Sequence, residues 1–326
     1  MNQLRSVQVL RAIAALAVVF FHLSPSSWTL GAAGVDLFFV ISGFIMGTVG
    51  LGDSPGRFMS KRVIRIVPLY WAITLAMCVA SQVPGLFSTF TFDLPRLITS
   101  LFFIPFQDPQ GEIWPLVVVG WTLNYEMFFY LLFALGLWLR RPIIAPVLVI
   151  CGLVAAGWIF QPAQTIPHFY TSQLLLEFAL GLLLSRAVFF KNAALGSALV
   201  LAGFASLLSW GLASDTPDWR IIYWGLPALA IVAGFVAIER AGAFPGQALR
   251  PLEKLGDASY SLYLTHGIVL GIIGKFIGHE SGFAVLAALV ACITVAMLSY
   301  YLFERPVGQI LRGLLFARPQ QPGAPA

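Results

Sequence analysis

Ten apolar stretches of about 20 residues each limit how this chain of 326 residues can fold. A helix of that length covers the hydrocarbon core of a bilayer, which is roughly 30 Å thick. The stretches are residues 7–23, 33–51, 66–84, 114–139, 142–160, 171–190, 194–213, 220–238, 258–278 and 282–303. They predict an all-α fold, a polytopic membrane helical bundle of about ten transmembrane helices.

The composition leaves no room for a separate soluble domain. Hydrophobic residues make up 59% of the chain and charged residues only 10%, against about a quarter charged in ordinary soluble domains. We expect one transmembrane domain over residues 1–316 and a disordered tail, "ARPQQPGAPA", over residues 317–326. No small-x-small cleavage site follows the first apolar stretch, so we interpret it as a retained span rather than a signal peptide.

The lysines and arginines between the spans predict the orientation. With the N-terminus in the cytoplasm, fifteen of them fall on the cytoplasmic side and three, Arg96, Arg220 and Lys275, on the other. This asymmetry follows the positive-inside rule and predicts that both termini are cytoplasmic. The net charge of +5 therefore reflects membrane topology, and we expect no nucleic-acid partner. A shorter apolar run, residues 97–106, is expected to lie at the outer interface.

The first span, in "LRAIAALAVVFFH", carries an arginine and a histidine. Arg11 and His22 are eleven positions apart, so they share one helix face and lie about 16 Å apart along its axis. Ionisable groups inside a span usually face the bundle interior or a wet cavity. The pair could hold the two ends of one long ligand. Taken singly, Arg11 could snorkel to the headgroups and His22 could be an interfacial residue.

Two carboxylates and a second histidine also lie in predicted spans. Asp36 is expected at the same outer level as His22, where a carboxylate could fix the imidazole tautomer and raise its basicity; a favourable helix dipole is the simpler explanation. Glu126 lies well inside the fourth span among aromatic residues, which favours a functional role or a structural polar network. His266 lies about two turns into the ninth span, and a packing hydrogen bond accounts for it equally well.

Arg62 and Arg65 are three positions apart at the cytoplasmic mouth of the third span. Two guanidiniums so spaced could grip a phosphate, although positive-inside anchoring also explains them. Ser42 and Gly43 permit a close helix contact. Glu177 and the closing "FERP" fit a structural or anchoring role. The three cysteines lie in apolar runs without metal-ligand spacing, and we expect no metal site.

Together these segments resemble the acyltransferase-3 family of integral membrane acyltransferases over most of the chain. The resemblance rests on six segments in order: "LRAIAALAVVFFH", "GVDLFFVISGFIM", the Arg62–Arg65 pair, "WTLNYEMFFY", "SYSLYLTH" and "FERP". The chain has Thr122 where the family often has serine, and its "NYE" around Glu126 is not the commonest version. The lack of an added extracytoplasmic domain looks like the members that acylate exopolysaccharides.

The resemblance implies transfer of an acyl group, usually acetyl, from cytoplasmic acyl-CoA to a carbohydrate hydroxyl at a bacterial inner membrane. By position, Arg11, Arg62 and Arg65 would bind the CoA phosphates and His22 would be catalytic. Asp36 and Glu126 join the candidate catalytic set, with Ser42, Trp121, Tyr260 and His266 as supporting residues. The implied partners are acyl-CoA as a donor substrate, with no permanently bound cofactor, a carbohydrate acceptor that can be lipid-linked, and membrane lipid.

We expect His22, oriented by Asp36, to remove the proton from the sugar hydroxyl as it attacks the thioester. An acetyl-histidine intermediate is the other possibility. A transporter or flippase of a lipid-linked sugar or acyl group is the non-enzymatic alternative, disfavoured by the lack of an internal repeat. A lipid-phosphate glycosyltransferase is disfavoured because no acidic cluster suits a metal ion.

Overall fold

The computed structural model describes residues 4–23, 29–81, 93–108, 110–187, 191–211, 219–277 and 281–316, and the regular structure in these ranges is helical. The helices are α1 (Arg5–Leu23), α2 (Gly34–Val49), α3 (Pro55–Ala80), α4 (Leu94–Leu101), α5 (Trp121–Trp138), α6 (Ile144–Phe160), α7 (Thr165–Tyr170), α8 (Leu175–Arg186), α9 (Ala193–Gly211), α10 (Leu226–Arg240), α11 (Arg250–Asp257), α12 (Ser259–Ile277), α13 (Gly282–Ser299) and α14 (Arg305–Phe316). Short turns extend them: η1 (Thr29–Ala33), η2 (Gly50–Gly52) and η3 (Val118–Gly120) are 3-10 turns, and η4 (Ile221–Gly225) and η5 (Tyr300–Glu304) are π turns. The predicted tail, residues 317–326, lies outside the described residues.

The predicted all-α, multi-span architecture is confirmed. Seven segments of the described chain are long and apolar enough to cross a bilayer: Arg5–Leu23, Thr29–Gly52, Pro55–Ala80, Val118–Trp138, Ala193–Trp210, Ile221–Arg240 and Gly282–Phe316. The other predicted spans correspond to α6, α8 and α12, of which α8 has only 12 residues. Ten crossings therefore remain a prediction. Large apolar side chains on the outside, such as Phe160 at 76% exposure and Phe276 at 84%, suit contact with lipid.

Three helix boundaries differ from the predicted ones. α3 begins eleven residues early, at Pro55, because Ser54 caps it by accepting a hydrogen bond from the backbone N–H of Arg57. Residues 114–117 are not helical, so the fourth span starts at Val118. The last helix continues through the π turn η5 into α14 and ends at Phe316, well past the predicted end at residue 303.

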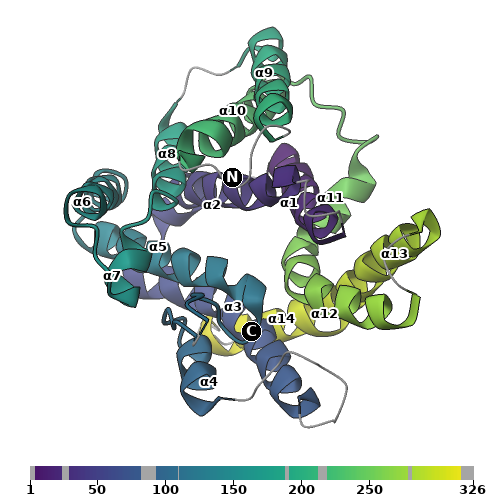
Figure 1. Cartoon of the computed structure of the whole chain (residues 1–326). Helices are drawn as coiled ribbons and strands as arrows, with labels where there is room; N and C mark the ends of the chain where they lie inside the picture. The colour runs from purple at the N-terminus through teal and green to yellow at the C-terminus, as the bar shows by residue number, and fades with distance from the viewer. Residues whose placement is uncertain are drawn as a thin grey trace, which may run out of the picture.

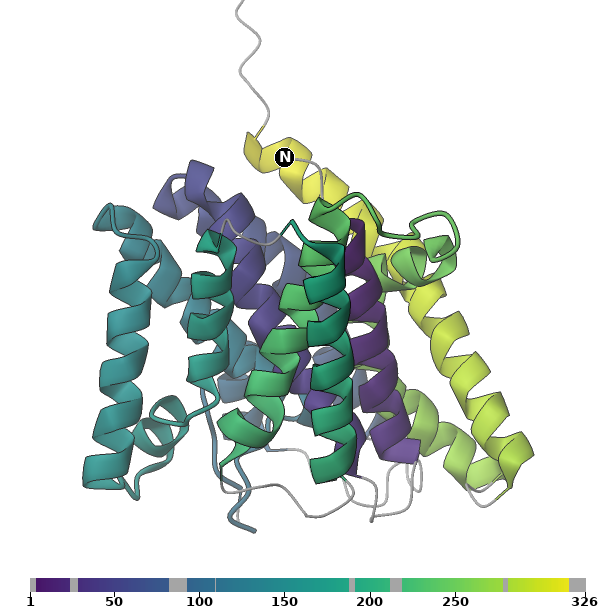
Figure 2. The same ribbon diagram turned by 90° about the horizontal axis from the view of Figure 1, so that it is seen from above.

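α1 and α2 are the central helices of the bundle (Figure 1). α8 and α10 pack against α2 on one side, α5 on another, and α12 packs against α1. The elements run mostly across the same slab, and the described chain begins and ends on one face of it (Figure 2). This arrangement gathers side chains of α1, α2, α3, α5 and α12 around one interior space.

α2 and α8 approach so closely that only glycine fits where they cross. A Cβ atom on Gly43 would lie 2.1 Å from the carbonyl oxygen of Phe178, and one on Gly181 would lie 2.1 Å from that of Val40. Small residues let membrane helices pack backbone to backbone, where dispersion contacts supply the stability. The predicted close contact at Gly43 is confirmed, and Gly181 is its partner.

We expect Gly43→Ala to destabilise the bundle, because the added methyl group must push α2 and α8 apart. Overpacking of this kind costs about 1–3 kcal/mol. Thermal unfolding of the detergent-solubilised protein measures the effect as a lowered Tm. Gly152→Ala is the matched control, since a Cβ there meets nothing within 4 Å. Equal Tm values for the two variants would contradict the proposed contact.

Candidate active site

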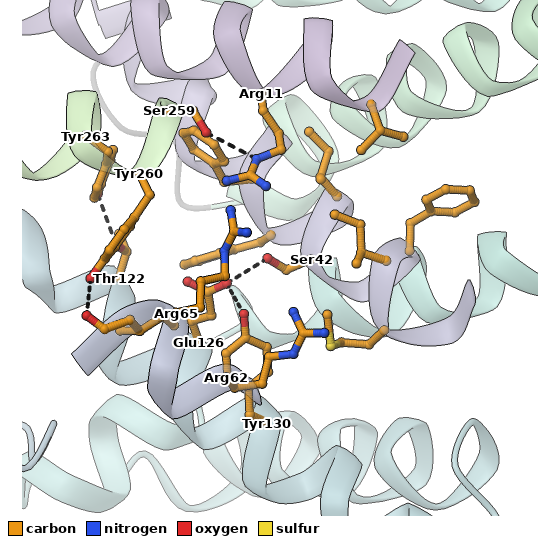
Figure 3. Close-up of a pocket in the computed structure, with 18 of the residues that line it drawn as sticks. Arg11, Ser42, Arg62, Arg65, Thr122, Glu126, Tyr130, Ser259, Tyr260 and Tyr263 are labelled. Carbon is orange, nitrogen blue, oxygen red and sulfur yellow. Dashed lines mark hydrogen bonds between the residues drawn. The ribbon is translucent and has the colours of Figure 1, made fainter. Parts of the chain in front are cut away.

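A cavity of about 330 Å³ opens between α1, α2, α3, α5 and α12. Its polar lining residues are Gln8, Arg11, Ser42, Thr48, Arg62, Arg65, Thr122, Glu126, Tyr130, Ser259, Tyr260 and Tyr263. Figure 3 shows the three arginines pointing into the same space from α1 and α3, facing Glu126 on α5. Six of the predicted site residues therefore meet in one cavity: Arg11, Ser42, Arg62, Arg65, Glu126 and Tyr260.

The three guanidinium groups have almost no partners. Arg11 Nε donates one hydrogen bond to Ser259 Oγ at 3.2 Å. Arg62 lies over the rings of Phe58 and Tyr130, 5.3 and 5.7 Å from their centroids, and its buried Nε has no partner among the described residues. Buried charged groups are normally paired and hydrogen-bonded.

The Arg65 guanidinium likewise makes no hydrogen bond or ion pair within the described part of the chain, so three arginines share the cavity lining with one carboxylate. The excess positive charge and free N–H donors fit a multiply charged anion such as phosphate. Just outside the span, burial raises the pKa of Asp257, although Arg11 and Arg65 beside it act in the opposite direction.

Glu126 is already held by its neighbours. Ser42 Oγ donates to Glu126 Oε1 at 3.0 Å, and the Tyr130 hydroxyl, one helical turn away on α5, donates to the same oxygen. These bonds tie α2 to α5 and fix the carboxylate without using any of the arginines (Figure 3). Glu126 thus balances part of the positive charge in the cavity while the guanidinium donors stay available.

The segment "SYSLYLTH" fastens α12 to the rest of the cavity wall. The Tyr260 hydroxyl donates to the carbonyl oxygen of Ile66 at 2.7 Å. The Tyr263 hydroxyl donates to the carbonyl oxygen of Val119 at 3.2 Å and lies 3.0 Å from Thr122 Oγ1. Because threonine supplies this hydroxyl, the departure from serine at position 122 keeps the contact.

The closing "FERP" has a similar structural role. Ser261 Oγ donates to Glu304 Oε2 at 2.7 Å, which links α12 to the π turn η5. The interpretation of this segment as structural is consistent with that bond.

His22 lies outside the cavity and next to His266. The two ring centroids are 5.0 Å apart and the planes are tilted by 58°. His22 Nδ1 is 2.9 Å from the carbonyl oxygen of Val18, and His266 Nδ1 is 2.7 Å from that of Tyr263. A carbonyl oxygen only accepts, so the tautomer that makes these bonds carries its proton on Nδ1 and its lone pair on Nε2.

The two histidines differ in access. His22 is exposed, whereas His266 is fully buried and its Nε2 has no partner among the described residues. His22 therefore presents a basic nitrogen at the protein surface, as a general base requires. Trp121, the remaining predicted supporting residue, packs edge-on against Tyr125 and is not among the cavity-lining residues.

The prediction that Asp36 orients His22 is wrong. Arg220 Nε donates to Asp36 Oδ1 at 2.9 Å, and its Nη2 donates to Oδ2 at 2.7 Å. The guanidinium also lies 4.5 Å from the centroid of the Trp224 ring. The Asp36 side chain is fully buried and that of Arg220 is 15% exposed. The carboxylate is therefore held by a bidentate guanidinium rather than by the His22 imidazole.

Several residues of these networks were not predicted from the sequence. Arg220 was counted only as an outer-loop charge, and nothing in the spacing connects it to Asp36. Glu177, expected from the sequence to have a structural or anchoring role, is fully buried on α8 and lies beside Asp36 and Arg220. Ser259 and Tyr263 fall inside the quoted "SYSLYLTH", so their motif was visible although their contacts were not.

A family model described as an acyltransferase domain matches residues 4–304. The chain belongs to the acyltransferase-3 family. It is 37% identical to the exopolysaccharide production protein ExoZ of Rhizobium meliloti (strain 1021), over 89% of this chain and 94% of that protein. It is 27% identical to the putative membrane-bound transacylase BcsY of Komagataeibacter xylinus, over 93% of this chain and 83% of that protein. No solved structure matches the chain.

More distant similarity extends to larger acyltransferase-3 proteins. The O-acetyltransferase OatA of Staphylococcus aureus (strain NCTC 8325 / PS 47) is 24% identical over 91% of this chain, which covers 56% of OatA. The family resemblance noted from the sequence is thus confirmed, and the protein is a membrane acyltransferase. The arginine cavity and the paired histidines lie in the part of the chain that the family model covers.

We expect Arg220→Met to destabilise the protein strongly, because it leaves Asp36 as a buried charge without its cation. Removing one partner of a buried ion pair costs about 3 kcal/mol or more. The loss is measured as a lower Tm in detergent. The double variant Asp36→Asn with Arg220→Met should recover at least half of it, since no charge is then stranded. If both variants melted alike, the ion pair would not be what stabilises this region.

Proposed function

We propose that this protein transfers an acetyl group from cytoplasmic acetyl-CoA to a hydroxyl of an exopolysaccharide or another cell-surface carbohydrate. The names of two relatives support this substrate class: one is an exopolysaccharide production protein, and a more distant one is an O-acetyltransferase. An acyl-CoA donor suits the site because CoA carries a diphosphate and a 3′-phosphate, all strongly anionic.

The observation that carries the proposal is a set of three arginines in one cavity. Within the described chain their guanidinium groups make one hydrogen bond in total, from Arg11 to Ser259. Arg11, Arg62 and Arg65 offer guanidinium donors that fit phosphate oxygens in a bidentate manner. Arg11 is buried, and Arg62 and Arg65 are half-buried; partial burial strengthens an ionic contact. Binding the donor phosphates would supply the counter-charge that the cavity lacks.

The position of the cavity supports donor entry from the cytoplasm. Leu4 and Val49, at the start of α1 and the end of α2, are among its lining residues. These ends lie on the face where the described chain begins and ends (Figure 2). The helix ends at this face carry Arg5, Arg57 and Lys61, and by the positive-inside rule these charges support a cytoplasmic orientation of the face.

We assign the proton transfer to His22 Nε2. The Nε2 lone pair takes the proton of the acceptor hydroxyl while the hydroxyl oxygen attacks the carbonyl carbon of the thioester. The carbon–sulfur bond then breaks, the CoA sulfur leaves as a thiolate, and the imidazolium proton can neutralise it. Val18, rather than Asp36, holds the imidazole in the tautomer that this step needs. Acetylation of Nε2 itself is the alternative route, and trapping labelled protein in the absence of acceptor would distinguish it.

Arg62→Gln should raise the Kd for acetyl-CoA by about tenfold or more, because one desolvated phosphate contact is lost. Isothermal titration of the detergent-solubilised protein with acetyl-CoA measures the change. Arg57→Gln is the matched control on the same helix, since Arg57 is 59% exposed and 3.6 Å from Asp53. If the two variants bound acetyl-CoA with equal Kd, Arg62 would be assigned to membrane anchoring instead of donor binding.

His22→Ala should reduce acetyl transfer about 100-fold or more, in the range of general-base catalysis, without weakening acetyl-CoA binding. Transfer is measured as labelled acetyl ester in the polysaccharide fraction of membranes from a host that lacks its own copy of the gene. Near-normal turnover would rule out His22 as the base. Vesicle uptake of a lipid-linked sugar without ester formation by the unmodified protein would instead favour a transporter.

A further inference from the structure

The arginine cavity and the histidine pair are separate compartments. Phe38 and Tyr263 are among the residues that line the cavity, whereas neither His22 nor His266 is among its described lining residues. Four rings instead form a continuous row from the cavity to the surface histidine. Their centroids are 5.7 Å apart from Phe38 to Tyr263, 5.9 Å from Tyr263 to His266, and 5.0 Å from His266 to His22.

The two rings at the cavity end of this row are held differently. Tyr263 is fixed at its hydroxyl by Val119 and Thr122 on the opposite wall, and is only 7% exposed. Phe38 has no polar anchor, is half-buried, and packs where all three hydrophobic clusters of the bundle meet. Phe38 is therefore the ring of the pair that can change rotamer without breaking a hydrogen bond.

The neighbouring ring on α2 shows the contrast. Phe39 is stacked on Phe178 with centroids 4.4 Å apart and an interplanar angle of 27°, and it is 3% exposed. Its ring belongs to a run of stacked aromatics that also includes Phe129 and Phe178. Of these two neighbouring rings on α2, Phe38 is therefore the one that can change rotamer.

An acyl group bound through its CoA phosphates must pass this pair of rings to reach His22. Arg11 and His22 lie about 16 Å apart along α1, so the pantetheine arm would have to extend along the helix and cross the level of Phe38. The two rings stand edge to face, with an interplanar angle of 73°.

We propose that Phe38, set against the fixed ring of Tyr263, limits the length of the acyl group that can be transferred, and so makes acetyl the favoured one. This inference rests on the proposed function, because it assumes that acyl-CoA is the donor and that His22 is where the acyl group is used. A shorter side chain at position 38 would widen the space beside Tyr263, and the arginines would still bind the phosphates of the donor.

The test compares acetyl-CoA, propionyl-CoA and butyryl-CoA as donors in membranes from the same gene-deleted host, scored as ester in the polysaccharide fraction. Phe38→Ala should raise the butyryl-to-acetyl ratio of kcat/KM at least tenfold, within the range for added methylenes in an apolar pocket. Phe38→Leu should give a smaller rise, which keeps the test valid if the alanine variant fails to fold. Phe38→Trp should lower the ratio below that of the unmodified protein.

Phe129→Ala is the matched control, because Phe129 is a fully buried ring of the same core that does not line the cavity. The butyryl-to-acetyl ratio of this variant should stay within twofold of that of the unmodified protein, even if its total activity falls. If every Phe38 variant transferred acetyl with an unchanged butyryl-to-acetyl ratio of kcat/KM, Phe38 would not limit acyl length. The proposed function would be unaffected by that result. Absence of ester from all three donors in the unmodified protein would overturn the proposed function itself.

Discussion

Uncompensated positive charge inside an apolar bundle is the constraint around which the rest of the structure is arranged. Moving a charge out of water is expensive unless it is paired and hydrogen-bonded. Here Glu126 offsets one of three cations but accepts its hydrogen bonds from Ser42 and Tyr130. Other contacts therefore hold the bundle together: the Tyr260 hydroxyl ties α12 to α3, which carries two of the arginines, and α2 packs against α8 at the glycine crossing.

α2 separates two polar regions that a simple amphipathic helix would merge. Ser42 faces the arginine cavity, whereas Asp36 faces Arg220 on the side of α8 and α10. In the second region Asp36 is held by a bidentate ion pair with Arg220. In the first region three arginines line the cavity with one carboxylate, and most of their guanidinium donors have no partner among the described residues.

The sequence predicted the parts of the site that depend on one helix and failed where the partner came from elsewhere. Arg62 and Arg65 face one cavity because residues three apart share a helix face, and Arg11 joins them from a neighbouring span. Asp36 was assigned to His22 because both were expected at the same outer level. Depth in the membrane does not specify the direction around the bundle, and the actual partner, Arg220, is 184 positions away in the chain.

The helix boundaries were likewise predicted only in part from the sequence. The apolar core of each span was visible as hydropathy, but the capped start of α3 at Ser54 and the continuation of α13 into α14 depend on polar residues. Helical phase placed Arg11 and His22 on the same side of α1, yet it could not reveal that the rings of α12 and α2 stand between the cavity and the histidine.

The bond between His22 and Val18 has a further consequence. Most imidazole bases depend on a carboxylate delivered by another part of the fold, so that they are competent only when the two parts are docked. Here the proton on Nδ1 is fixed by the same helix one turn earlier. The nitrogen that would do the chemistry is therefore ready before any substrate arrives, and it stays ready if the surrounding helices shift to let one in.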